Sequence, residues 1–293
     1  MSVWDWILAG FGLALGAGAA LALRTRAIWM KLLGLQTPRR PFAEHVERMR
    51  PHVQVRTPQG EGPFPAAVLM HGCGGVRTIM HAYADTAVQA GAAAVIVDSL
   101  SPRGIDYETA IKEVCSGRRL WGRERAADLY AALAIAREDA RIDADRLALA
   151  GWSHGGWSVL DAMALARAGG RPDGLSAAPA APLAGVRAAF LVYPFIAFPA
   201  IAARQRWLEG VPIEAVLVEG DDRASDATAR KALEAARAQG RPVEIETIGG
   251  VTHAFDEPDH HSGSTLRYDD LQTKRLHARF ARFIKRMLLE PRA

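Results

Sequence analysis

The sequence has few cysteines and little excess of charge of either sign. Its 293 residues include two cysteines, Cys73 and Cys115, which cannot make a framework of several disulfides or a four-ligand zinc site by themselves. The 36 basic and 32 acidic side chains leave a net charge of +4, which is slight for this length, and no array of aromatic and basic residues points to nucleic acid. Because 49% of the residues are hydrophobic, the composition excludes an intrinsically disordered chain and favours a packed core.

One long apolar run lies near the N-terminus. Trp6–Leu23 contains 18 consecutive uncharged residues, which as a helix would span about 27 Å, close to the hydrocarbon thickness of a bilayer. Asp5 is the only charged residue before this run, whereas a secretory signal peptide carries positive charge there. We therefore predict that residues 1–40 form a membrane anchor followed by a basic linker. A cleaved signal peptide is the alternative, and a buried soluble helix is the third possibility.

The excess positive charge of the chain is concentrated around this run. Residues 1–50 contain seven basic and three acidic side chains, whereas residues 51–293 contain 29 of each. Arg24, Arg26 and Lys31 follow the apolar run, so the positive-inside rule predicts an N-terminus outside the membrane and a cytoplasmic remainder. A cleaved signal would instead predict an exported remainder.

From residue 41 to residue 293, short apolar runs alternate with amphipathic stretches, which predicts a single α/β domain. The apolar runs are mostly bounded by Gly, Pro or Asp, as buried strands are. We predict strands over residues 52–57, 66–70, 92–97, 147–150, 186–192, 214–218 and 243–248. We predict helices over residues 79–90, 121–138, 156–168, 225–239 and 266–289. This alternation indicates a mostly parallel, doubly wound sheet with helices on both faces.

The strongest functional motif is Gly151-Trp152-Ser153-His154-Gly155-Gly156, between a predicted strand and a predicted helix. A nucleophile on such a tight turn needs small neighbours two residues before and two residues after it, and Gly151 and Gly155 meet that demand. The turn exposes the Ser153 hydroxyl, and the helix behind it directs its positive end toward developing negative charge. This context favours a catalytic nucleophile over a coincidental glycine-rich loop.

A serine hydroxyl needs a base, and the base needs a carboxylate that orients it. Where the nucleophile occupies this kind of turn, the acid and then the base follow in the chain, each after a later strand. Asp221 and Asp222 follow the predicted strand at 214–218, and His253 follows the one at 243–248. Both positions therefore lie at the carboxyl edge of the sheet. We predict His253 as the base and Asp221 or Asp222 as the acid.

An oxyanion hole needs a backbone N–H from the residue after the nucleophile, which is His154, and a second from an early strand-to-helix loop. The stretch Met70-His71-Gly72-Cys73-Gly74-Gly75 follows a predicted strand and is of the glycine-rich type that supplies it. We interpret Cys73 as a small residue whose backbone N–H matters, with a reactive thiol as the alternative.

Taken in order, these motifs resemble the dienelactone hydrolase family of α/β-hydrolases over about Pro51–Leu289. The blocks that carry the resemblance are VLMHGCGG (Val68–Gly75), VDSLSPRG (Val97–Gly104), Cys115, Ala127-Asp128, DADRLALAGWSHGG (Asp143–Gly156), EGDD (Glu219–Asp222) and THAFD (Thr252–Asp256). The resemblance implies the α/β-hydrolase fold, Ser153 as nucleophile, His253 as base, and oxyanion-hole N–H groups from Cys73 and His154. It points to Asp221 as the acid, with Asp222 as the alternative. The founding members use a cysteine nucleophile, so the serine argues against dienelactone itself as the substrate.

We therefore predict a hydrolase of small-molecule carboxylic esters or lactones that needs no metal or organic cofactor. One alternative is a serine peptidase of the prolyl-oligopeptidase type, but the large extra domain of such peptidases does not fit in the remaining chain of roughly 250 residues. Another is a catalytically silent, membrane-tethered binding module, which the complete triad order argues against. We expect specificity to lie in Ser99–Leu120, Arg171–Gly185 and Phe195–Trp207, where Arg103 is predicted to brace its loop rather than meet an anionic substrate.

Overall fold

The computed structural model describes residues 37–204, 207, 210–260 and 263–290, together with Trp4, Trp6, Gly12, residues 15–22, Thr25, Arg26 and Met30. The chain divides into two compact units, Met1–Arg39 and Arg40–Ala293. In the first unit residues 15–22 are helical. The rest of the apolar run Trp6–Leu23, apart from Trp6 and Gly12, lies outside the described residues. None of the helices formed by the described residues is both long enough and apolar enough to cross a membrane.

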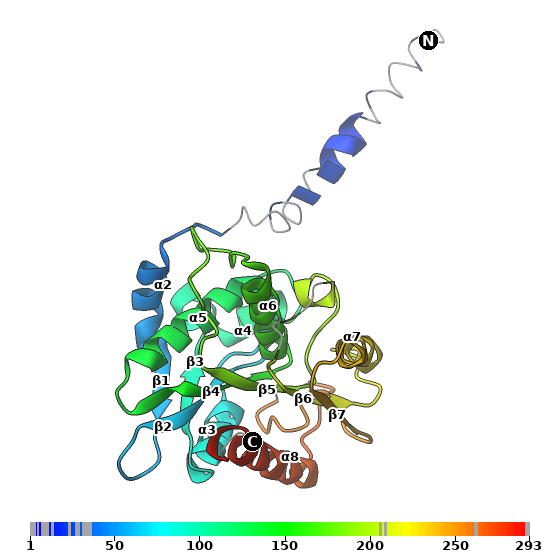
Figure 1. Cartoon of the computed structure of the whole chain (residues 1–293). Coiled ribbons are helices and arrows are strands. Elements are labelled where there is room, and N and C mark those ends of the chain that lie inside the picture. Colours follow the sequence, from blue (N-terminus) through cyan, green and yellow to red (C-terminus); the bar gives the residue numbers. More distant parts are fainter. Residues whose placement is uncertain are drawn as a thin grey trace. The chain divides into compact units, whose positions relative to one another are not determined.

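The second unit is built on a sheet in which the described residues form seven strands, in the order β1-β3-β2-β4-β5-β6-β7 (Figure 1). The strands are β1 (Val53–Arg56), β2 (Phe64–Met70), β3 (Ala93–Val97), β4 (Ile142–Trp152), β5 (Val186–Val192), β6 (Ile213–Val218) and β7 (Val243–Ile248). Strand β1 pairs with β3 in antiparallel orientation, and the other neighbours are parallel. The carboxyl ends of the parallel strands therefore lie along one edge, where proteins of this class gather their functional loops.

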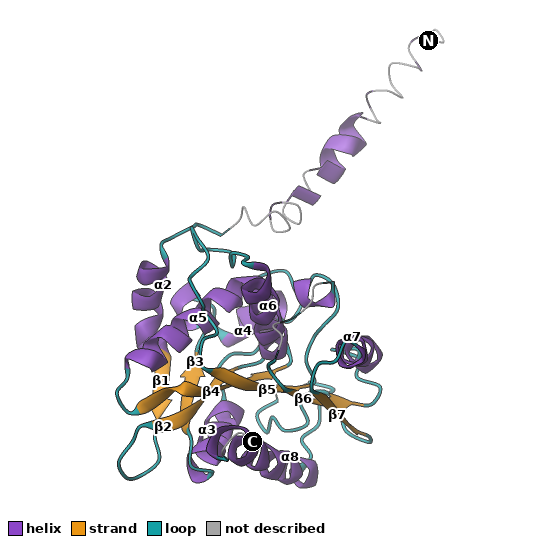
Figure 2. Ribbon diagram, viewed as in Figure 1, coloured by secondary structure: helices purple, strands orange, loops and turns teal. Residues whose placement is uncertain are grey.

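Helices cover both faces of this sheet (Figure 2). They are α2 (Phe42–Met49), α3 (Thr78–Gln89), α4 (Tyr107–Thr109), α5 (Gly122–Glu138), α6 (His154–Ala168), α7 (Asp226–Ala238) and α8 (Asp270–Ile284), with π-helical turns η3 (Ala110–Val114) and η5 (Lys285–Leu289). Side chains of α2, α5, α6 and α7 pack with Val68 and Leu149 on one face. Side chains of α3 and α8 pack with Leu69 and Ala150 on the other. Because successive strand residues point to opposite faces and both faces are covered, these strands have continuous apolar sequences.

The α/β-hydrolase architecture predicted from the sequence is confirmed, with differences at the ends of some elements. Strand β4 begins at Ile142, five residues before the apolar run that predicted it. The run does not extend to this start because Asp143, Asp145 and Arg146 interrupt the apolar pattern. Helix α8 begins at Asp270 rather than at 266, because the Asp269 side chain accepts the Gln272 N–H at 2.9 Å and caps the helix there. Helix α2 was not predicted, and it packs on α5 through Val46 and Met49.

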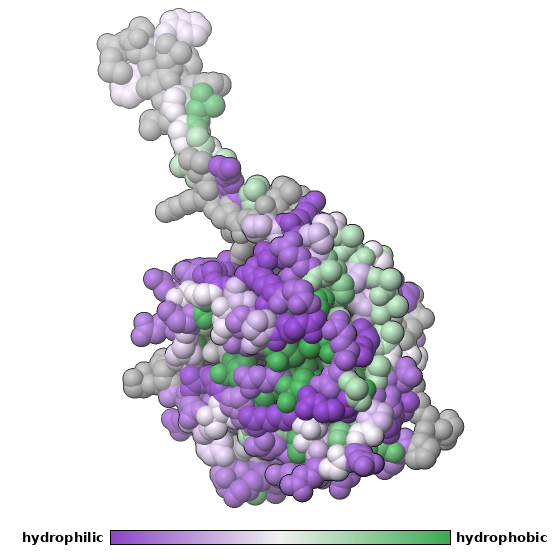
Figure 3. Space-filling view, turned by 90° about the vertical axis from the view of Figure 1, so that its left-hand side faces the viewer, coloured by the Kyte–Doolittle hydropathy of each residue, from purple (hydrophilic) through white to green (hydrophobic). Residues whose placement is uncertain are grey.

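The surface of the domain is mostly hydrophilic on the side nearest α2 and β1, with a smaller group of hydrophobic side chains near the middle of that face (Figure 3). Some exposed apolar surface of this kind is normal on a globular domain.

Candidate active site

Strand β4 passes into α6 at Ser153, whose backbone has φ 52° and ψ −112°. A serine seldom adopts a positive φ, and such strained residues cluster at active sites. The turn is possible because the residues two positions before and two positions after Ser153 are glycines. A Cβ on Gly155 would lie 1.9 Å from the Met70 carbonyl oxygen, and a Cβ on Gly151 would lie 2.6 Å from the Gly155 backbone. The two glycines of the motif are therefore sterically required for this turn.

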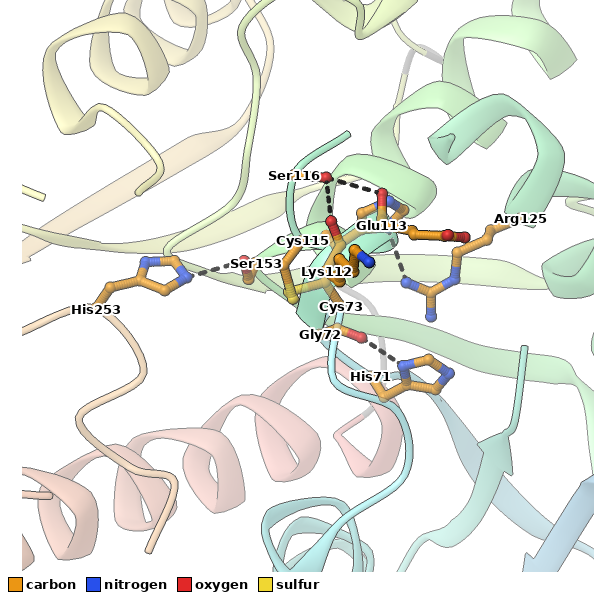
Figure 4. The surroundings of a disulfide bond; sticks show 11 residues. His71, Gly72, Cys73, Lys112, Glu113, Cys115, Ser116, Arg125, Ser153 and His253 are labelled. Carbon is orange, nitrogen blue, oxygen red and sulfur yellow. Dashed lines mark hydrogen bonds between the residues drawn. A yellow bond between two sulfur atoms is a disulfide. The ribbon is translucent and has the colours of Figure 1, made fainter. Parts of the chain in front are cut away.

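Two later loops bring a histidine and an aspartate to Ser153. His253, which follows β7, has its Nε2 2.9 Å from Ser153 Oγ, a contact drawn in Figure 4. The Nδ1 atom of His253 lies 2.6 Å from Oδ2 of Asp221, which follows β6. Asp221 also accepts the backbone N–H groups of Arg223 and Ala224, at 2.8 and 3.0 Å. The three side chains form one hydrogen-bonded chain, in the order of the sequence motifs.

The structure places Asp221 rather than Asp222 against the histidine. The Asp222 side chain is 74% exposed and its Oδ1 lies 3.6 Å from Arg223 Nε, whereas the Asp221 side chain is 1% exposed. Burial raises the pKa of Asp221, but the hydrogen bond and charge of His253 and two backbone N–H groups outweigh burial and hold that pKa below its ordinary value. Asp221 is therefore an ionised carboxylate, suited to hold the Nδ1–H of His253 and leave Nε2 to accept a proton.

A second buried carboxylate lies behind His253. Asp256 accepts hydrogen bonds from the hydroxyl groups of Tyr193 at 2.5 Å and Tyr83 at 2.8 Å. The Tyr193 ring in turn lies 4.5 Å from the His253 ring, centroid to centroid. Burial raises the pKa of Asp256, and the two hydroxyl donors offset this only in part. The sequence motifs gave these tyrosines no role, because nothing in the linear pattern pairs α3 and the end of β5 with the THAFD block.

The loop after β2 passes on the other side of Ser153, where a Cβ on Gly72 would lie 3.9 Å from Ser153 Cβ. His71 is buried in this loop, with its Nε2 3.1 Å from the Ser99 backbone nitrogen and its Nδ1 2.5 Å from the Gly72 carbonyl oxygen. Because Nε2 accepts the Ser99 N–H, the proton must be on Nδ1, which donates to the carbonyl. Burial and the charge of Arg125 lower the pKa of His71 to about 3, so the ring is neutral.

This hydrogen bond sets the direction of the next N–H group. The Gly72 carbonyl and the Cys73 N–H belong to one trans peptide, so they point in opposite directions. With the carbonyl turned to His71, the Cys73 N–H points away from that ring. Within the part of the chain that the structure describes, neither this N–H nor the His154 N–H at the start of α6 donates to a protein acceptor. Both groups remain available to a substrate oxygen.

Cys73 is joined to Cys115 by a disulfide, so the alternative of a free, reactive thiol is wrong, whereas the role predicted for the Cys73 backbone N–H stays a prediction. The Sγ–Sγ distance is 1.97 Å and the Cα atoms lie 5.0 Å apart (Figure 4). The two residues are 42 positions apart, a separation that gives no sign of pairing. The one available signal was that the sequence has two cysteines and that both lie in blocks of the family resemblance. The disulfide joins the loop after β2 to the segment that contains α4 and η3.

A buried ion cluster braces the same segment. Arg103 donates to both carboxylate oxygens of Asp128, at 2.9 and 3.0 Å, and to the Ser99 carbonyl at 2.8 Å. His45 Nε2, from α2, lies 2.9 Å from Asp128 Oδ1. Burial raises the pKa of Asp128, but the Arg103 charge and the hydrogen bonds from His45 and Arg103 outweigh it and hold that pKa well below its ordinary value. The geometry agrees with the expectation that Arg103 braces its loop.

A buried guanidinium lies behind the loop and the start of α6. Arg125, in α5, is fully buried, and its Nη1 lies 3.0 Å from Nδ1 of His154. Burial lowers the pKa of Arg125 to about 9, so the group stays charged at neutral pH. Burial and this charge together lower the pKa of His154 well below its ordinary value, which leaves the ring neutral. Sequence reasoning missed Arg125, and its only signal was the neighbouring Ala127-Asp128 block.

Two of the three segments expected to govern specificity have contacts beside the site. In the first, the Tyr107 ring would lie 3.4 Å from a Cβ placed on Gly74. In the segment after β5, Phe195 donates its N–H to the Ser153 carbonyl at 3.2 Å. The remaining segment, between α6 and β5, is instead tied to α5, where Arg137 donates to two of its carbonyl oxygens.

The assembled groups can support nucleophilic attack on a carbonyl carbon. A hydroxyl, a base and an orienting carboxylate lie in sequence on one side, and two available backbone N–H groups lie in the loops on the other. Among the described residues, no three His, Cys, Asp or Glu side chains are grouped as metal ligands would be.

Several solved structures are similar to the chain in fold. A dienelactone hydrolase-like promiscuous phosphotriesterase from metagenomic libraries has a TM-score of 0.59 at 17% identity, covering 80% of this chain and 99% of its own. Est1E from Butyrivibrio proteoclasticus, solved with ferulic acid bound, has a TM-score of 0.56 at 15% identity, covering 81% and 95%. Dienelactone hydrolase from Anabaena variabilis has a TM-score of 0.54 at 18% identity, covering 80% and 91%. At these identities the likeness establishes the fold alone.

Sequence comparison establishes the family. No curated protein matches the sequence at a significant level. The model of the dienelactone hydrolase family matches residues 52–288, which is nearly the whole second unit and includes Ser153, Asp221 and His253. This range agrees with the one over which the ordered motifs carry the resemblance. The chain therefore belongs to the dienelactone hydrolase family of α/β-hydrolases and is a carboxylic ester hydrolase.

Proposed function

We propose that the protein hydrolyses ester or lactone bonds of small molecules through a triad of Ser153, His253 and Asp221. The observation that carries the proposal is the unbroken chain of hydrogen bonds from Asp221 through His253 to Ser153, with the serine held in a strained turn. A hydroxyl in this arrangement is activated because its proton has an acceptor 2.9 Å away and the acceptor is itself oriented by an ionised carboxylate.

In the acylation half of the reaction, Ser153 Oγ attacks the substrate carbonyl carbon while His253 Nε2 takes the hydroxyl proton. The carbonyl oxygen becomes an oxyanion, which the backbone N–H groups of Cys73 and His154 stabilise. When the tetrahedral intermediate collapses, the bond to the leaving oxygen breaks and the imidazolium gives its proton to that oxygen. In a lactone the new hydroxyl stays attached to the acyl group.

In the deacylation half, water replaces the alcohol. His253 takes a proton from the water as its oxygen attacks the acyl carbon, and the same two N–H groups hold the second oxyanion. Collapse breaks the bond to Ser153 Oγ, which recovers its proton from the imidazolium. Asp221 remains ionised throughout and stabilises the positive charge on His253.

Aromatic residues close to the serine support a substrate that has an apolar part. Tyr107 flanks the loop after β2, and Phe195 follows β5 directly beneath Ser153. Phe198, three residues further on, is 57% exposed. A structural neighbour was solved with ferulic acid, an aromatic carboxylic acid, so a feruloyl ester belongs in the substrate panel with aliphatic esters and lactones.

The test is esterase activity of the full chain, purified in mild detergent. We expect hydrolysis of short-chain p-nitrophenyl esters, and Ser153→Ala should lower kcat by roughly 10,000-fold or more. Ser176→Ala, a change at an exposed serine, is the matched control and should leave activity unchanged. Thermal melting followed by circular dichroism checks that each variant is folded. Equal turnover by the Ser153 variant would refute the nucleophile assignment.

We also propose that the apolar run near the N-terminus attaches the chain to a membrane. The basic residues after the run favour a cytoplasmic hydrolase domain. The disulfide supports the exported alternative, because structural disulfides persist mainly in oxidising compartments. Carbonate extraction and N-terminal sequencing distinguish the two. An anchored chain stays in the membrane pellet with its N-terminal segment intact, whereas a chain released by signal cleavage is recovered as soluble protein that begins near Leu23.

A further inference from the structure

The disulfide has one end on a residue that the proposed mechanism uses. Cys73 lies in the stretch Gly72-Cys73-Gly74-Gly75, and glycine allows the backbone more conformations than any other residue. Between His71 and Val76, Cys73 is the one residue that has a side chain. Its sulfur is therefore the one point in this stretch at which a side chain can fix the backbone.

Hydrogen bonds fix this stretch at the Gly72 carbonyl oxygen. His71 Nδ1–H holds the Gly72 carbonyl at 2.5 Å, and the Gly75 N–H reaches the same oxygen at a longer 3.4 Å. Gly75 itself has φ 91°, a conformation that favours glycine. The peptide that carries the Cys73 N–H is thus held on its carbonyl side by His71, and the disulfide holds the residue that follows.

The other end of the disulfide is on a well-supported segment. Cys115 follows η3 and donates its N–H to the Ala110 carbonyl at 2.9 Å. Five buried side chains form a small core in this segment, and Cys73 packs against them: Leu100, Ile105, Ala110, Val114 and Leu120. The pairing of Arg103 with Asp128 ties the same segment to α5. The disulfide therefore connects a glycine-rich stretch to a rigid support.

Cys115 is exposed and Cys73 is partly exposed, so a thiol reagent has access to the cysteine pair. Exposed disulfides are the ones that react with thiols. A thiolate of dithiothreitol attacks one sulfur to give a mixed disulfide, and the second thiol of the reagent then displaces the protein sulfur. Two electrons and two protons pass to the cysteine pair, and the reagent leaves as its cyclic disulfide.

We propose that the Cys73–Cys115 disulfide is a positioning element for the oxyanion hole, so that the oxidised protein is the active form and reduction slows catalysis reversibly. This inference rests on the proposed function. The contact of the Cys73 N–H with the substrate oxygen strengthens in the transition state, so loosening it lowers kcat and leaves KM nearly unchanged. Loss of one oxyanion donor costs roughly 100- to 1,000-fold in kcat. A reduced loop still visits the productive conformation, so we expect a smaller loss of roughly 10- to 100-fold.

The first experiment compares the full chain in oxidised, reduced and reoxidised states. The kcat and KM for a p-nitrophenyl ester are measured per active site, counted by titration with a fluorophosphonate. Free thiols are counted under native conditions with a chromogenic disulfide reagent. We expect no free thiol before reduction and two after it, with the loss confined to kcat and restored by reoxidation. Two free thiols in untreated protein, or unchanged kcat after complete reduction, would overturn the proposal.

Variants give the same test without a reducing agent. Cys115→Ser breaks the disulfide and leaves the Cys73 backbone in place, so its kcat should match that of the reduced protein and not respond to dithiothreitol. Ser116→Ala is the matched control, because Ser116 is the exposed neighbour whose hydroxyl donates within its own turn, to the Lys112 carbonyl at 2.7 Å. It should keep the disulfide, so its kcat should fall on reduction and recover on reoxidation by the same factors as in the wild-type protein. Full kcat in the Cys115 variant would contradict a positioning role.

Two further measurements separate positioning from general stability. A trifluoromethyl ketone that adds to the serine places an oxyanion in the hole, so its inhibition constant should rise by the factor by which kcat falls. Backbone hydrogen exchange of a peptide that covers residues 71–76 should become faster on reduction. If reduction lowers the count of titratable active sites or abolishes cooperative melting, the disulfide stabilises the fold and does not position the oxyanion hole. If reduction raises KM and leaves kcat unchanged, the disulfide shapes the substrate-binding surface and does not position the oxyanion hole. Absence of esterase activity in the oxidised protein would refute the proposed function itself, which is a different outcome from equal activity in both redox states.

Discussion

The two sides of Ser153 are held in place by different means. On the base side, side chains bond to one another, with His253 between Ser153 and Asp221. On the oxyanion side, the available donors are backbone N–H groups, and a neutral His71 ring and a disulfide fix the loop that carries one of them. A side chain that must gain and lose a proton needs partners that accept both states. A backbone donor never titrates and needs only a fixed direction, which a covalent bond can supply.

The buried carboxylates behind the two sides also differ, because their pKa values are shifted in opposite directions. Asp256, behind the base, is 2% exposed, and burial raises its pKa because two hydroxyl donors and a weaker effect of the His253 charge offset burial only in part. Asp128, behind the oxyanion side, is fully buried, but Arg103 supplies a positive charge that overcomes burial and lowers its pKa. Burial is nearly equal at the two sites, so the counter-charge decides the direction of the shift.

We expect the greatest loss of kcat from a substitution of the triad acid on the base side of Ser153. Asp221→Asn should lower kcat by roughly 1,000- to 10,000-fold, because the amide no longer holds the Nδ1–H tautomer of His253. Asp222→Asn removes an exposed carboxylate next to the same turn and should leave kcat nearly unchanged. Steady-state kinetics on one p-nitrophenyl ester, with melting curves for both variants, make the comparison. Equal small losses in the two variants would exclude both residues as the triad acid.

The base side could be predicted from the sequence because its determinants are local. The turn at Ser153 leaves no space for a Cβ at Gly151 or Gly155, and that demand appears directly as a motif. The acid and the base each follow a parallel strand, and the alternating pattern of apolar runs predicts those strands. The choice between Asp221 and Asp222 needed coordinates, since both follow β6 and the turn at Gly220, with φ 69°, decides which side chain faces His253.

The oxyanion side was only partly predictable, because its supports come from distant parts of the chain. The glycine-rich loop was visible as a motif, but its anchor is a cysteine 42 residues away. Asp128 is held by His45 from α2 and by Arg103 from the loop after β3. Each of these residues on its own is an ordinary polar residue, and only the packing of three elements turns them into one buried cluster.

The second prediction is a loss of unfolding free energy when the carboxylate of the ion cluster on the oxyanion side is removed. Asp128→Asn leaves the largely buried Arg103 guanidinium, whose side chain is 17% exposed, without its carboxylate. Removal of one partner from a buried ion pair costs roughly 3–5 kcal/mol of unfolding free energy. The matched control is Asp85→Asn, which breaks an ion pair with Arg56 in which the aspartate is 58% exposed, and which should cost less than about 1 kcal/mol. Urea unfolding at pH 7 measures both. Equal losses in the two variants would contradict the special role of the buried pair.

The loss of unfolding free energy in the Asp128→Asn variant should depend on pH and become smaller in acid. The pKa of Asp128 is lowered in the folded protein, so its carboxylate stabilises the fold above the ordinary unfolded value near 4. Below that pH the unfolded chain binds a proton that the folded protein does not, and the advantage shrinks. The difference in unfolding free energy between the wild-type protein and the Asn variant should therefore narrow as the pH falls below about 4.

The smallest expected effect is the pH dependence of stability due to Asp256, which should have the opposite sign to that of Asp128. The pKa of Asp256 is raised in the folded protein, where the hydroxyl groups of Tyr83 and Tyr193 and the charge of His253 face it. Between the ordinary unfolded value near 4 and the raised value, the folded protein keeps a proton that the unfolded chain has lost, so stability falls as the pH rises. Asp256→Asn is neutral at every pH and removes this fall, which amounts to about 1.4 kcal/mol per pH unit within that window. Urea unfolding from pH 4 upward measures the difference in unfolding free energy between the wild-type protein and this variant, and the wild-type excess should shrink as the pH rises. An excess that is constant or grows would mean that Asp256 is ionised in the folded protein and that its hydroxyl partners suffice in place of a counter-charge.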